Sequence, residues 1–353
     1  MPRLTRDDLY HVGYEVISAL GAPDGHASIV ASHLADANLT GHDSHGIIRI
    51  PQYVENARKG WIDPNGEPEI VADTPTTARV DGHHTFGQVV AGYSARVAID
   101  KAKNSGISLV TMSSLSHIGR VGSYTEMAAN EGMAAIMFTG ILGEGGFVMA
   151  PFGGKVARLS SNPITMSFPY KPDSPILLDF ATTIGAEGKL RIYRARGQKL
   201  PEEWVLDSDG SPSRDPNDFY NGGAVLPIGG IHGGHKGYAL AMMAATLGGI
   251  LGEFGKPPPA DGWYTSGSTI IVIDVSALAP LDKLTSDVDG LVQLTKDTPL
   301  MEGAQEILYP GEKEAKTRHE RLVSGVEVED ATWEQITGLI MDFGLESKLG
   351  RFL

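Results

Sequence analysis

Residues 42–53 read His-Asp-Ser-His-Gly-Ile-Ile-Arg-Ile-Pro-Gln-Tyr, and no other stretch bears so directly on how the chain folds and acts. Its His45, Arg49 and Tyr53 are spaced i, i+4 and i+8, so on one helix their side chains would share a face. Arginine binds carboxylates through paired hydrogen bonds, and histidine exchanges a proton near neutral pH. The spacing therefore predicts a helix that presents a site for a small substrate bearing a carboxylate.

Two residues of this stretch leave a simpler interpretation open. Ser44 can cap a helix or hydrogen-bond the imidazole of His45. Pro51 would remove a hydrogen bond and kink the axis if it lay in the middle of a helix. A helix start that carries a solvated histidine and arginine accounts for the stretch equally well.

The flanking sequence predicts a helical subdomain over the first 60 residues. A capping box, with Asp in place of Glu, spans Thr5 to Asp8 and precedes apolar residues at helical spacing. A second helix is expected from Asp24, and a third over 45–59. The proline-rich and acidic residues 61–76 are expected to form a linker across the surface.

From about residue 77 the pattern changes to short β-rich runs that alternate with helical segments, which indicates an α/β domain. The expected strands cover residues 78–82, 107–112, 133–138, 176–179 and 270–274. The expected helices cover residues 88–104, 123–131, 237–250, 313–323 and 331–342. Residues 196–235 hold many Gly, Pro and Asp residues without clear periodicity, so we expect long ordered loops there, which are often functional.

Composition limits the classes of function. A chain of 353 residues favours two closely packed lobes, and its formal charge of −14, with no basic patch, argues against nucleic acid and anionic membranes as partners. The absence of cysteine excludes disulfides, thiolate catalysis and Cys-ligated metals. The chain begins without the apolar core of a signal peptide and has no apolar run of about 20 residues, so we expect a cytoplasmic enzyme.

Glycine-rich or polar loops follow several β-rich segments. In residues 116–122 the glycines allow close approach to a phosphate, Arg120 can neutralise it, and His117 is a second acid/base candidate. Asp179 stands at a strand tip, where it could bind a ribose or cap the next helix. His235 and Lys236 are expected at the start of the Ala-rich helix, where positive charge opposes the helix dipole unless an anion also binds.

Common motifs are missing from the chain, which contains no G-x-G-x-x-G, no Walker A loop and no G-x-S-x-G. A Rossmann site, an NTPase and an α/β-hydrolase therefore lack support. The pairs His42/His45 and His232/His235 could be metal ligands, but no third ligand stands at a useful spacing. We expect no metal site.

Seven motifs occur together in one order along the chain. They are Asp43-Ser-His-Gly46 with Arg49 and Tyr53, Ser116-His-Ile-Gly119, Ser161-Asn-Pro163, Leu178-Asp-Phe-Ala-Thr182, Leu226-Pro-Ile-Gly229, His235-Lys-Gly-Tyr238 and Tyr309-Pro-Gly-Glu312. As a set they are highly specific, and over nearly its whole length the chain resembles the type 2 malate/L-lactate dehydrogenases. That family also includes ureidoglycolate, sulfolactate and diketogulonate dehydrogenases and a cyclic imine reductase.

The resemblance implies the fold and its division. It implies an α/β (α+β) protein with a non-Rossmann NAD(P)-binding fold, in which helices flank a mixed sheet, and a homodimer. Residues 1–72 would form an N-terminal helical subdomain that carries the catalytic stripe, and residues 73–308 the cofactor-binding domain. Residues 309–353 would be C-terminal helices that pack back on the N-terminal subdomain.

The resemblance also implies the site residues. His45 would be the proton donor and acceptor, oriented by Ser44, although some family members use the histidine at His117 as the base. Substrate contacts would come from Arg49, Tyr53 and Thr165. The dinucleotide would contact residues His117, Ile118, Gly119, Arg120, Val121, Asp179, Phe180, Ala181, His235, Lys236, Pro310, Gly311 and Glu312.

Two positions depart from the family pattern. Ser160 stands where many members have glycine, which could alter the floor of the pocket. Lys189 stands where the imine reductase branch has an acidic residue, which disfavours an imine substrate.

The sequence thus predicts an oxidoreductase that uses NAD or NADP to interconvert a small 2-hydroxy acid and its 2-oxo acid. The alternatives are an NADPH-dependent reductase of a cyclic imino acid and a catalytically silent binding protein of the same fold. The identity of the acid, the choice between NAD and NADP and the choice between His45 and His117 stay open at this stage.

Overall fold

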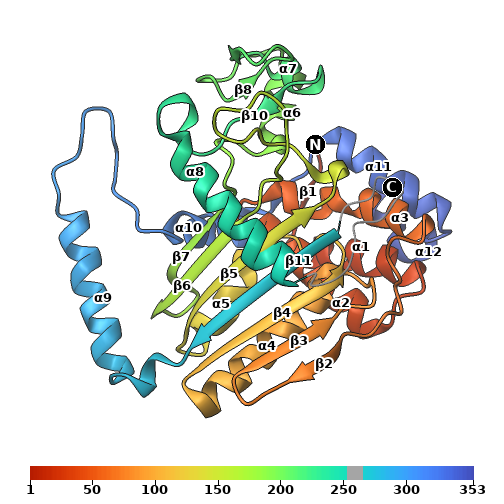
Figure 1. Ribbon diagram of the computed structural model, residues 1–353. Helices are drawn as coiled ribbons and strands as arrows, with labels where there is room; N and C mark the ends of the chain where they lie inside the picture. The colour runs from red at the N-terminus through yellow and green to blue at the C-terminus, as the bar shows by residue number, and fades with distance from the viewer. Residues whose placement is uncertain (253–264) are drawn as a thin grey trace.

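A seven-stranded mixed sheet organises the computed structural model, which describes residues 1–252 and 265–353 (Figure 1). The strand order is β2-β3-β4-β11-β5-β6-β7, and only the β3–β4 pair is parallel. The strands are β2 (Glu69–Asp73), β3 (Thr77–Asp81), β4 (Ile107–Leu115), β5 (Ala134–Leu142), β6 (Ile164–Lys171), β7 (Ser174–Phe180) and β11 (Thr265–Ile273). A mixed sheet flanked by helices confirms the expected fold class.

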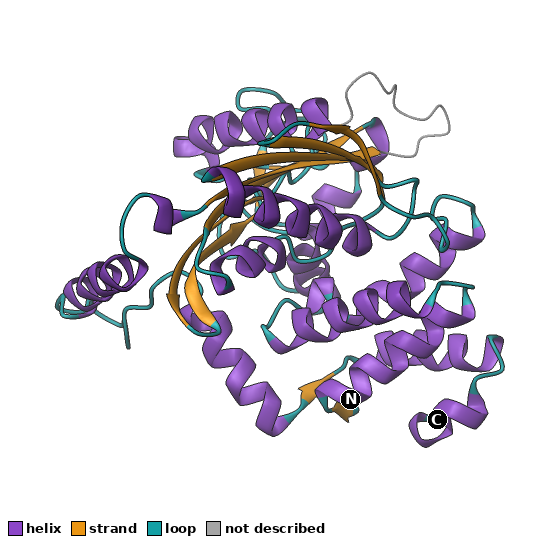
Figure 2. Cartoon of the chain, turned by 90° about the horizontal axis from the view of Figure 1, so that it is seen from below, coloured by secondary structure: helices purple, strands orange, loops and turns teal. Residues whose placement is uncertain are grey.

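Helices cover both faces of this sheet (Figure 2). On one face lie α4 (Gly87–Ser105) and α5 (Gly122–Asn130), and on the other lies α8 (Gly230–Ala244) with its π-helical continuation over 245–250. The continuation packs tightly on the sheet, because a Cβ on Gly140 would lie 2.4 Å from the backbone nitrogen of Gly249. Only glycine allows so close an approach of two backbones.

Segments from both ends of the chain form a second, helical body beside the sheet. Strand β1 (Arg3–Leu4) pairs with β12 (Val326–Glu327), so the start of the chain is held to its C-terminal segment. The helices of this body are α1 (Arg6–Ala19), α2 (Asp24–Leu39), α3 (Ile50–Arg58), α11 (Asp330–Asp342) and α12 (Glu346–Leu349). One continuous apolar core unites them, with side chains such as Leu9, Leu34, Tyr53, Ile336 and Leu349 at its centre.

The start of α1 follows its sequence closely. The Thr5 hydroxyl accepts a hydrogen bond from the Asp8 amide at 3.1 Å, and the Asp8 carboxylate accepts one from the Thr5 amide at 3.0 Å. These bonds satisfy amides that the first helical turn leaves without partners.

The expected helix over 45–59 is wrong at its beginning. Residues Asp43–His45 and Ile47–Arg49 form two 3-10 turns, and the α-helix begins only at Ile50. Pro51 thus lies in the first turn, where its missing amide hydrogen costs nothing. His45, Arg49 and Tyr53 therefore do not share one straight helical stripe.

Other expectations are also corrected. The linker over 61–76 contains the edge strand β2, because this strand pairs along β3. Helix α8 begins at Gly230, seven residues before the expected start. Residues 196–235 hold short elements rather than loops alone, namely β8 (Val205–Leu206), β9 (Pro212–Ser213), α7 (Pro216–Tyr220) and β10 (Ala224–Val225).

Strand β6 and two of the longer helices are among the elements that were not expected from the sequence. The helices are α6 (Glu187–Ala195) and α9 (Leu281–Lys296), and α9 projects away from the body of the molecule at the left of Figure 1. The helix α10 (Glu312–Ser324) lies between the sheet and the helical body, close to its expected bounds. In the described parts of the chain, no helix has the length and apolarity needed to cross a membrane.

Candidate active site

Two histidines from distant parts of the sequence face each other where the helical body meets the sheet. The imidazoles of His45 and His117 are stacked, with ring centroids 5.5 Å apart and planes inclined by 14°. His45 comes from the 3-10 turn before α3, and His117 from the loop after β4. The fold therefore brings together the two acid/base candidates that the sequence could only name separately.

Arg49 lies beside this pair and is held by two contacts. Its Nε donates to the carbonyl oxygen of Ser44 at 2.6 Å, and its Nη1 donates to Gln52 Oε1 at 2.8 Å. Among the described residues no hydrogen bond occupies Arg49 Nη2, and the side chain is only half-buried. The guanidinium thus keeps donors that can bind a carboxylate.

Ser44 contacts His45 directly, as the resemblance implied. Its hydroxyl lies 3.0 Å from Nδ1 of His45. A serine hydroxyl both donates and accepts, so it can serve either tautomer of the imidazole. The contact therefore orients the ring but does not determine which ring nitrogen carries the proton.

The electrostatic setting keeps both imidazoles neutral. Burial, followed by the charge of Arg49, lowers the pKa of His45 from its ordinary value of 6.5 to about 3. The same two causes hold the pKa of His117 well below 6.5. Burial and a nearby cation both disfavour a protonated imidazole, so each ring can accept a proton or donate a neutral N–H at neutral pH.

Tyr53 lies in the core beside His117. Its side chain is fully buried, and its hydroxyl lies 2.8 Å from Nδ1 of His117. Gln88, in the first turn of α4, donates from Nε2 to the same hydroxyl at 2.6 Å. Tyr53 therefore orients His117, and the expected substrate contact is not supported.

Thr165 also lies in the core. It lies on β6 and is fully buried, with its hydroxyl 2.9 Å from that of Thr125 on α5. A side chain with no exposed surface has no direct route to a bound acid. We therefore assign Thr165 no substrate contact.

The loop after β4 is fixed by partners from two directions. His33 Nε2, on α2, accepts a hydrogen bond from the Arg120 amide at 2.9 Å, and the Asp179 carboxylate accepts one from the Gly122 amide at 2.8 Å. The Arg120 guanidinium is buried and pairs with Glu126 at 2.8 Å. These contacts hold the backbone from Gly119 to Gly122 in one conformation.

The segments expected to hold the dinucleotide meet along β7 and its extension. The Leu177 amide donates to the Pro310 carbonyl oxygen, the Asp179 carboxylate binds Gly122, and the Ile228 amide donates to the Thr182 carbonyl oxygen. The last contact leads directly into α8. Loop 117–122, the turn at 310–312 and the start of α8 are therefore attached to one strand in a row.

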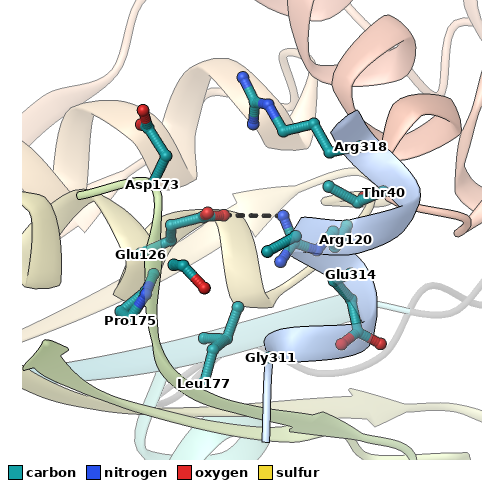
Figure 3. A pocket seen from close by; sticks show the side chains of 11 residues that line it. Thr40, Arg120, Glu126, Asp173, Pro175, Leu177, Gly311, Glu314 and Arg318 are labelled. Carbon is teal, nitrogen blue, oxygen red and sulfur yellow. Dashed lines mark hydrogen bonds and ion pairs between the residues drawn. The ribbon is translucent and has the colours of Figure 1, made fainter. Parts of the chain in front are cut away.

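A narrow cavity opens beside this row (Figure 3). It has a volume of about 10 Å³, and charged side chains surround it, including those of Arg120, Glu126, Glu314 and Arg318. Gly311 forms part of the wall, where a Cβ would lie 2.9 Å from the carbonyl oxygen of Pro175. The cavity joins loop 117–122 to the turn at 310–312.

Two residues that were expected to bind the cofactor lie at a different place on their helix than predicted. His235 and Lys236 lie in the second turn of α8 and are exposed, because the helix begins at Gly230. They lie beyond the unpaired amides of the first turn, so the argument from the helix dipole does not apply to them. The ring of His235 packs edge-on against Phe152, with centroids 5.7 Å apart.

The expected turn residues 310–312 are held by local contacts. Glu312 binds Lys296 at 2.6 Å, and it accepts a hydrogen bond from the Tyr309 amide. Its carboxylate therefore closes the turn at the start of α10.

The sequence did not identify His33 and Gln88, which hydrogen-bond to the Arg120 amide and to the Tyr53 hydroxyl. Each is a single polar residue on an amphipathic helix. The periodicity of one sequence does not distinguish such a residue from the other polar positions of the helix. In the described residues no group of three or more His, Cys, Asp or Glu side chains is arranged to hold a metal ion.

Comparisons with known proteins give consistent matches. A model of the malate/L-lactate dehydrogenase family matches residues 4–337. The malate dehydrogenase of Pyrococcus horikoshii is 33% identical over 351 residues, which is 98% of this chain and 96% of that protein. The malate/(S)-sulfolactate dehydrogenase of Methanothermus fervidus is 35% identical over 338 residues, covering 94% of this chain and 95% of that protein.

Solved structures give the same picture. The sulfolactate dehydrogenase from Methanocaldococcus jannaschii superposes with a TM-score of 0.86 at 32% identity, covering 97% of this chain and 98% of the other. The delta1-piperideine-2-carboxylate reductase from Pseudomonas syringae pvar. tomato superposes with a TM-score of 0.80 at 25% identity, covering 96% of this chain and all of the other.

Proposed function

Since this chain belongs to the malate/L-lactate dehydrogenase family and is a dehydrogenase of hydroxy acids, we propose a reaction and a role in it for each residue of the site. They support interconversion of a small 2-hydroxy acid and its 2-oxo acid with a nicotinamide nucleotide, NAD or NADP. The observation that carries the proposal is the stacked pair His45 and His117 beside Arg49.

Arg49 binds the substrate carboxylate through the donors that Ser44 and Gln52 leave available. This contact holds C2 next to the imidazoles, and such positioning supplies much of the rate of a bound reaction. In oxidation, His45 takes the hydroxyl proton while the C2–H bond breaks and its electron pair leaves as hydride. The C–O bond becomes a carbonyl, and the reverse reaction returns the proton from His45 to the oxygen.

The electrostatics of the site suit His45 as the base. We expected an unperturbed pKa near 6.5, but burial and the charge of Arg49 lower the pKa of His45 to about 3. The ring is therefore neutral before substrate binds. A bound carboxylate offsets the charge of Arg49 and raises the pKa, which favours proton uptake during oxidation.

The dinucleotide would lie along β7, where the residues fit such a ligand. Gly119, Gly122 and Gly311 let the loop and the turn pack closely on His33, Asp179 and Pro175, since a Cβ on each glycine would collide there. The buried Arg120 Nε has no hydrogen bond in the described structure. When bound, the nicotinamide supplies the hydride acceptor or donor. The residues that would hold it are Ile118, Gly119, Arg120, Val121, Asp179, Phe180, Ala181, His235, Lys236, Pro310, Gly311 and Glu312, together with His117.

We also propose that the protein forms a homodimer and works in the cytoplasm, where nicotinamide nucleotides are available. Large apolar side chains stand exposed on α8, its π-helical continuation and α9, including Met243, Ile250 and Leu294. Exposed apolar surface of this kind is typical of an interface.

A single screen tests the proposed function. NADH and NADPH oxidation would be followed with oxaloacetate, pyruvate, other 2-oxo acids and cyclic imino acids. We expect turnover with one or more 2-oxo acids and little with the imines. Turnover confined to the imines would replace this proposal with the reductase alternative, and no turnover with any substrate would favour a silent binding protein.

A further inference from the structure

The side chain of Asn38 binds both ends of the turn that carries His45. Asn38 lies in the last turn of α2, where its Oδ1 accepts a hydrogen bond from the Ile47 amide at 2.9 Å and its Nδ2 donates to the Asp43 carboxylate at 2.8 Å. His45 is the middle one of the three residues between these two contacts. One amide side chain thus closes a ring of hydrogen bonds around the proposed base.

The orientation of the Asn38 amide is determined by its two partners. A backbone N–H can only donate and an ionised carboxylate can only accept, so the oxygen of Asn38 must face Ile47 and its nitrogen must face Asp43. Asn38 is only 4% exposed. An amide turned the other way would lose both hydrogen bonds, and the loss of hydrogen bonds by buried groups is costly.

Gly46 shows how closely the turn approaches Asn38. A Cβ on Gly46 would lie 2.1 Å from Asn38 Oδ1, far inside van der Waals contact. Only glycine lets the turn pass so close to this amide. The motif Asp43-Ser-His-Gly46 therefore supplies both the carboxylate that Asn38 binds and the space that its oxygen requires.

Arg321, in the last turn of α10, binds the same carboxylate. Its Nη1 and Nη2 donate to Oδ1 and Oδ2 of Asp43 at 2.7 and 3.0 Å, and Nη1 also donates to the carbonyl oxygen of Asn38. Paired bonds of this kind define an orientation as well as a distance. The Asp43 side chain is half-exposed, and ion pairs at such sites contribute little to stability. The pair therefore bears more on where the turn lies than on whether the chain folds.

The position of this turn determines where two groups of the site lie. The Ser44 hydroxyl contacts Nδ1 of His45, and the Ser44 carbonyl oxygen accepts from Nε of Arg49. A shift of the turn would move the imidazole and the guanidinium relative to His117, which comes from the loop after β4. A displacement of about 1 Å can lower the rate of a bound reaction by about 10²-fold.

We propose that Asn38 and Arg321 are positioning residues that act through Asp43 and hold His45 where the reaction requires it. The catalytic meaning of this inference rests on the proposed function, whereas the position of the imidazole is a property of the protein alone. The two parts are therefore tested by different measurements.

The variant Asn38→Asp tests the ring of hydrogen bonds without substrate or cofactor. Its carboxylate keeps the acceptor for the Ile47 amide but faces the Asp43 carboxylate, and two like charges at this distance repel each other. In protein labelled with ¹⁵N-histidine at pH 8, with His45→Asn to assign the signals, we expect the His45 resonances to shift or broaden. Asn130→Asp makes the same exchange at an exposed position at the end of α5 and should keep the wild-type resonances.

The double variant Asn38→Asp/Asp43→Asn restores the contact with donor and acceptor exchanged. The new amide donates to the new carboxylate, and its oxygen remains an acceptor for Arg321. We therefore expect the His45 resonances to return to their wild-type positions. Wild-type resonances in a folded Asn38→Asp, or no recovery in a folded double variant, would overturn the role of Asn38.

Arg321→Met removes the other support and should fold, because the ion pair is half-exposed. We expect it to displace the His45 resonances and to lower kcat at least about tenfold, with the affinity for NAD(P)H within about threefold. Arg58→Met removes an ion pair between α3 and α11 and is the matched control, which should keep both the resonances and kcat.

The outcomes separate this inference from the proposed function. Unchanged His45 resonances in Arg321→Met would overturn the role of Arg321 whatever its kcat. Displaced resonances with unchanged kcat would overturn the catalytic part of the inference. Absence of turnover by the wild type in the substrate screen would instead refute the proposed function and leave the resonance test valid.

Discussion

At the residue scale, substitutions can separate the roles that we propose for the two histidines. We expect His45→Ala to abolish turnover while the affinity for NAD(P)H stays within a few fold, because the ring contributes its proton chemistry and little binding surface. Steady-state kinetics and a fluorescence titration with NAD(P)H measure the two effects. If His45→Ala kept a near wild-type kcat and His117→Ala did not, the proton transfer would belong to His117.

Arg49 carries the second prediction at this scale. Arg49→Lys keeps the charge but loses the planar arrangement of donors, so kcat/KM for the preferred 2-oxo acid should fall by about 1–3 kcal/mol in transition-state stabilisation. Lysine also cannot reproduce both of the contacts that Arg49 makes with Ser44 and Gln52. An unchanged KM for every accepted acid would remove Arg49 from the carboxylate site.

At the element scale, the sequence predicts a helix with clear end signals better than a segment held by contacts distant in the chain. Helix α1 begins at Arg6, directly after Thr5, which is the N-cap residue of the predicted capping box. The 3-10 turns before α3 could not be predicted, because the segment is held by contacts distant in the chain. The Asn38 side chain accepts from the Ile47 amide, and Arg321 of α10 binds the Asp43 carboxylate.

The candidate site shows the same division. His45, Ser44, Arg49 and His117 could be identified from local motifs, and the fold brings them together. The burial of Tyr53 and Thr165 could not, because it depends on the packing of β6, α5 and the helical body. The low pKa of His45 has the same origin, since burial is its first cause.

The observed start of α8 allows a sharper prediction for Lys236. Lys236 lies in the second turn, so any binding of phosphate there comes from its own ammonium group and not from the helix terminus. We expect Lys236→Ala to weaken NAD(P)H binding about tenfold with circular dichroism unchanged, since a lost charged hydrogen bond costs about 1.5–3 kcal/mol. Wild-type affinity in the titration would mean that Lys236 is a solvated residue.

For the whole molecule, neutral buried histidines link stability to pH. Burial, with a smaller effect of Arg120, lowers the pKa of His33 to about 3, whereas in the unfolded chain its value is about 6.5. Between these values the unfolded state binds the extra proton, so the contribution is complete above pH 6.5 and is lost as the pH falls toward 3. Over this range, each such group lowers the free energy of unfolding by about 1.4 kcal/mol for every unit by which the pH falls.

The variant His33→Gln tests this linkage, because a glutamine oxygen can still accept from the Arg120 amide. Urea unfolding at pH 7.0 and 5.5 should show a smaller acid loss in the variant than in the wild type, by roughly 1 kcal/mol. The same loss in both proteins would show that His33 titrates normally in the native state.

The projecting helix α9 bears on the homodimer that we propose. One of its sides is anchored, with Val292 buried and Tyr170 donating to Asp289, while Leu291 and Leu294 share another side and are 61% and 71% exposed. Exposed leucines at i, i+3 spacing on a helix that leaves the body of the molecule are better explained by a second copy than by solvent. We therefore expect Leu294→Glu to shift the protein toward monomer in sedimentation velocity, because it would bury a charge in the interface. Gln293→Glu adds the same charge on a different side of α9 and should leave the dimer intact; equal sedimentation of both variants and the wild type as dimers would exclude this side of α9 from the interface.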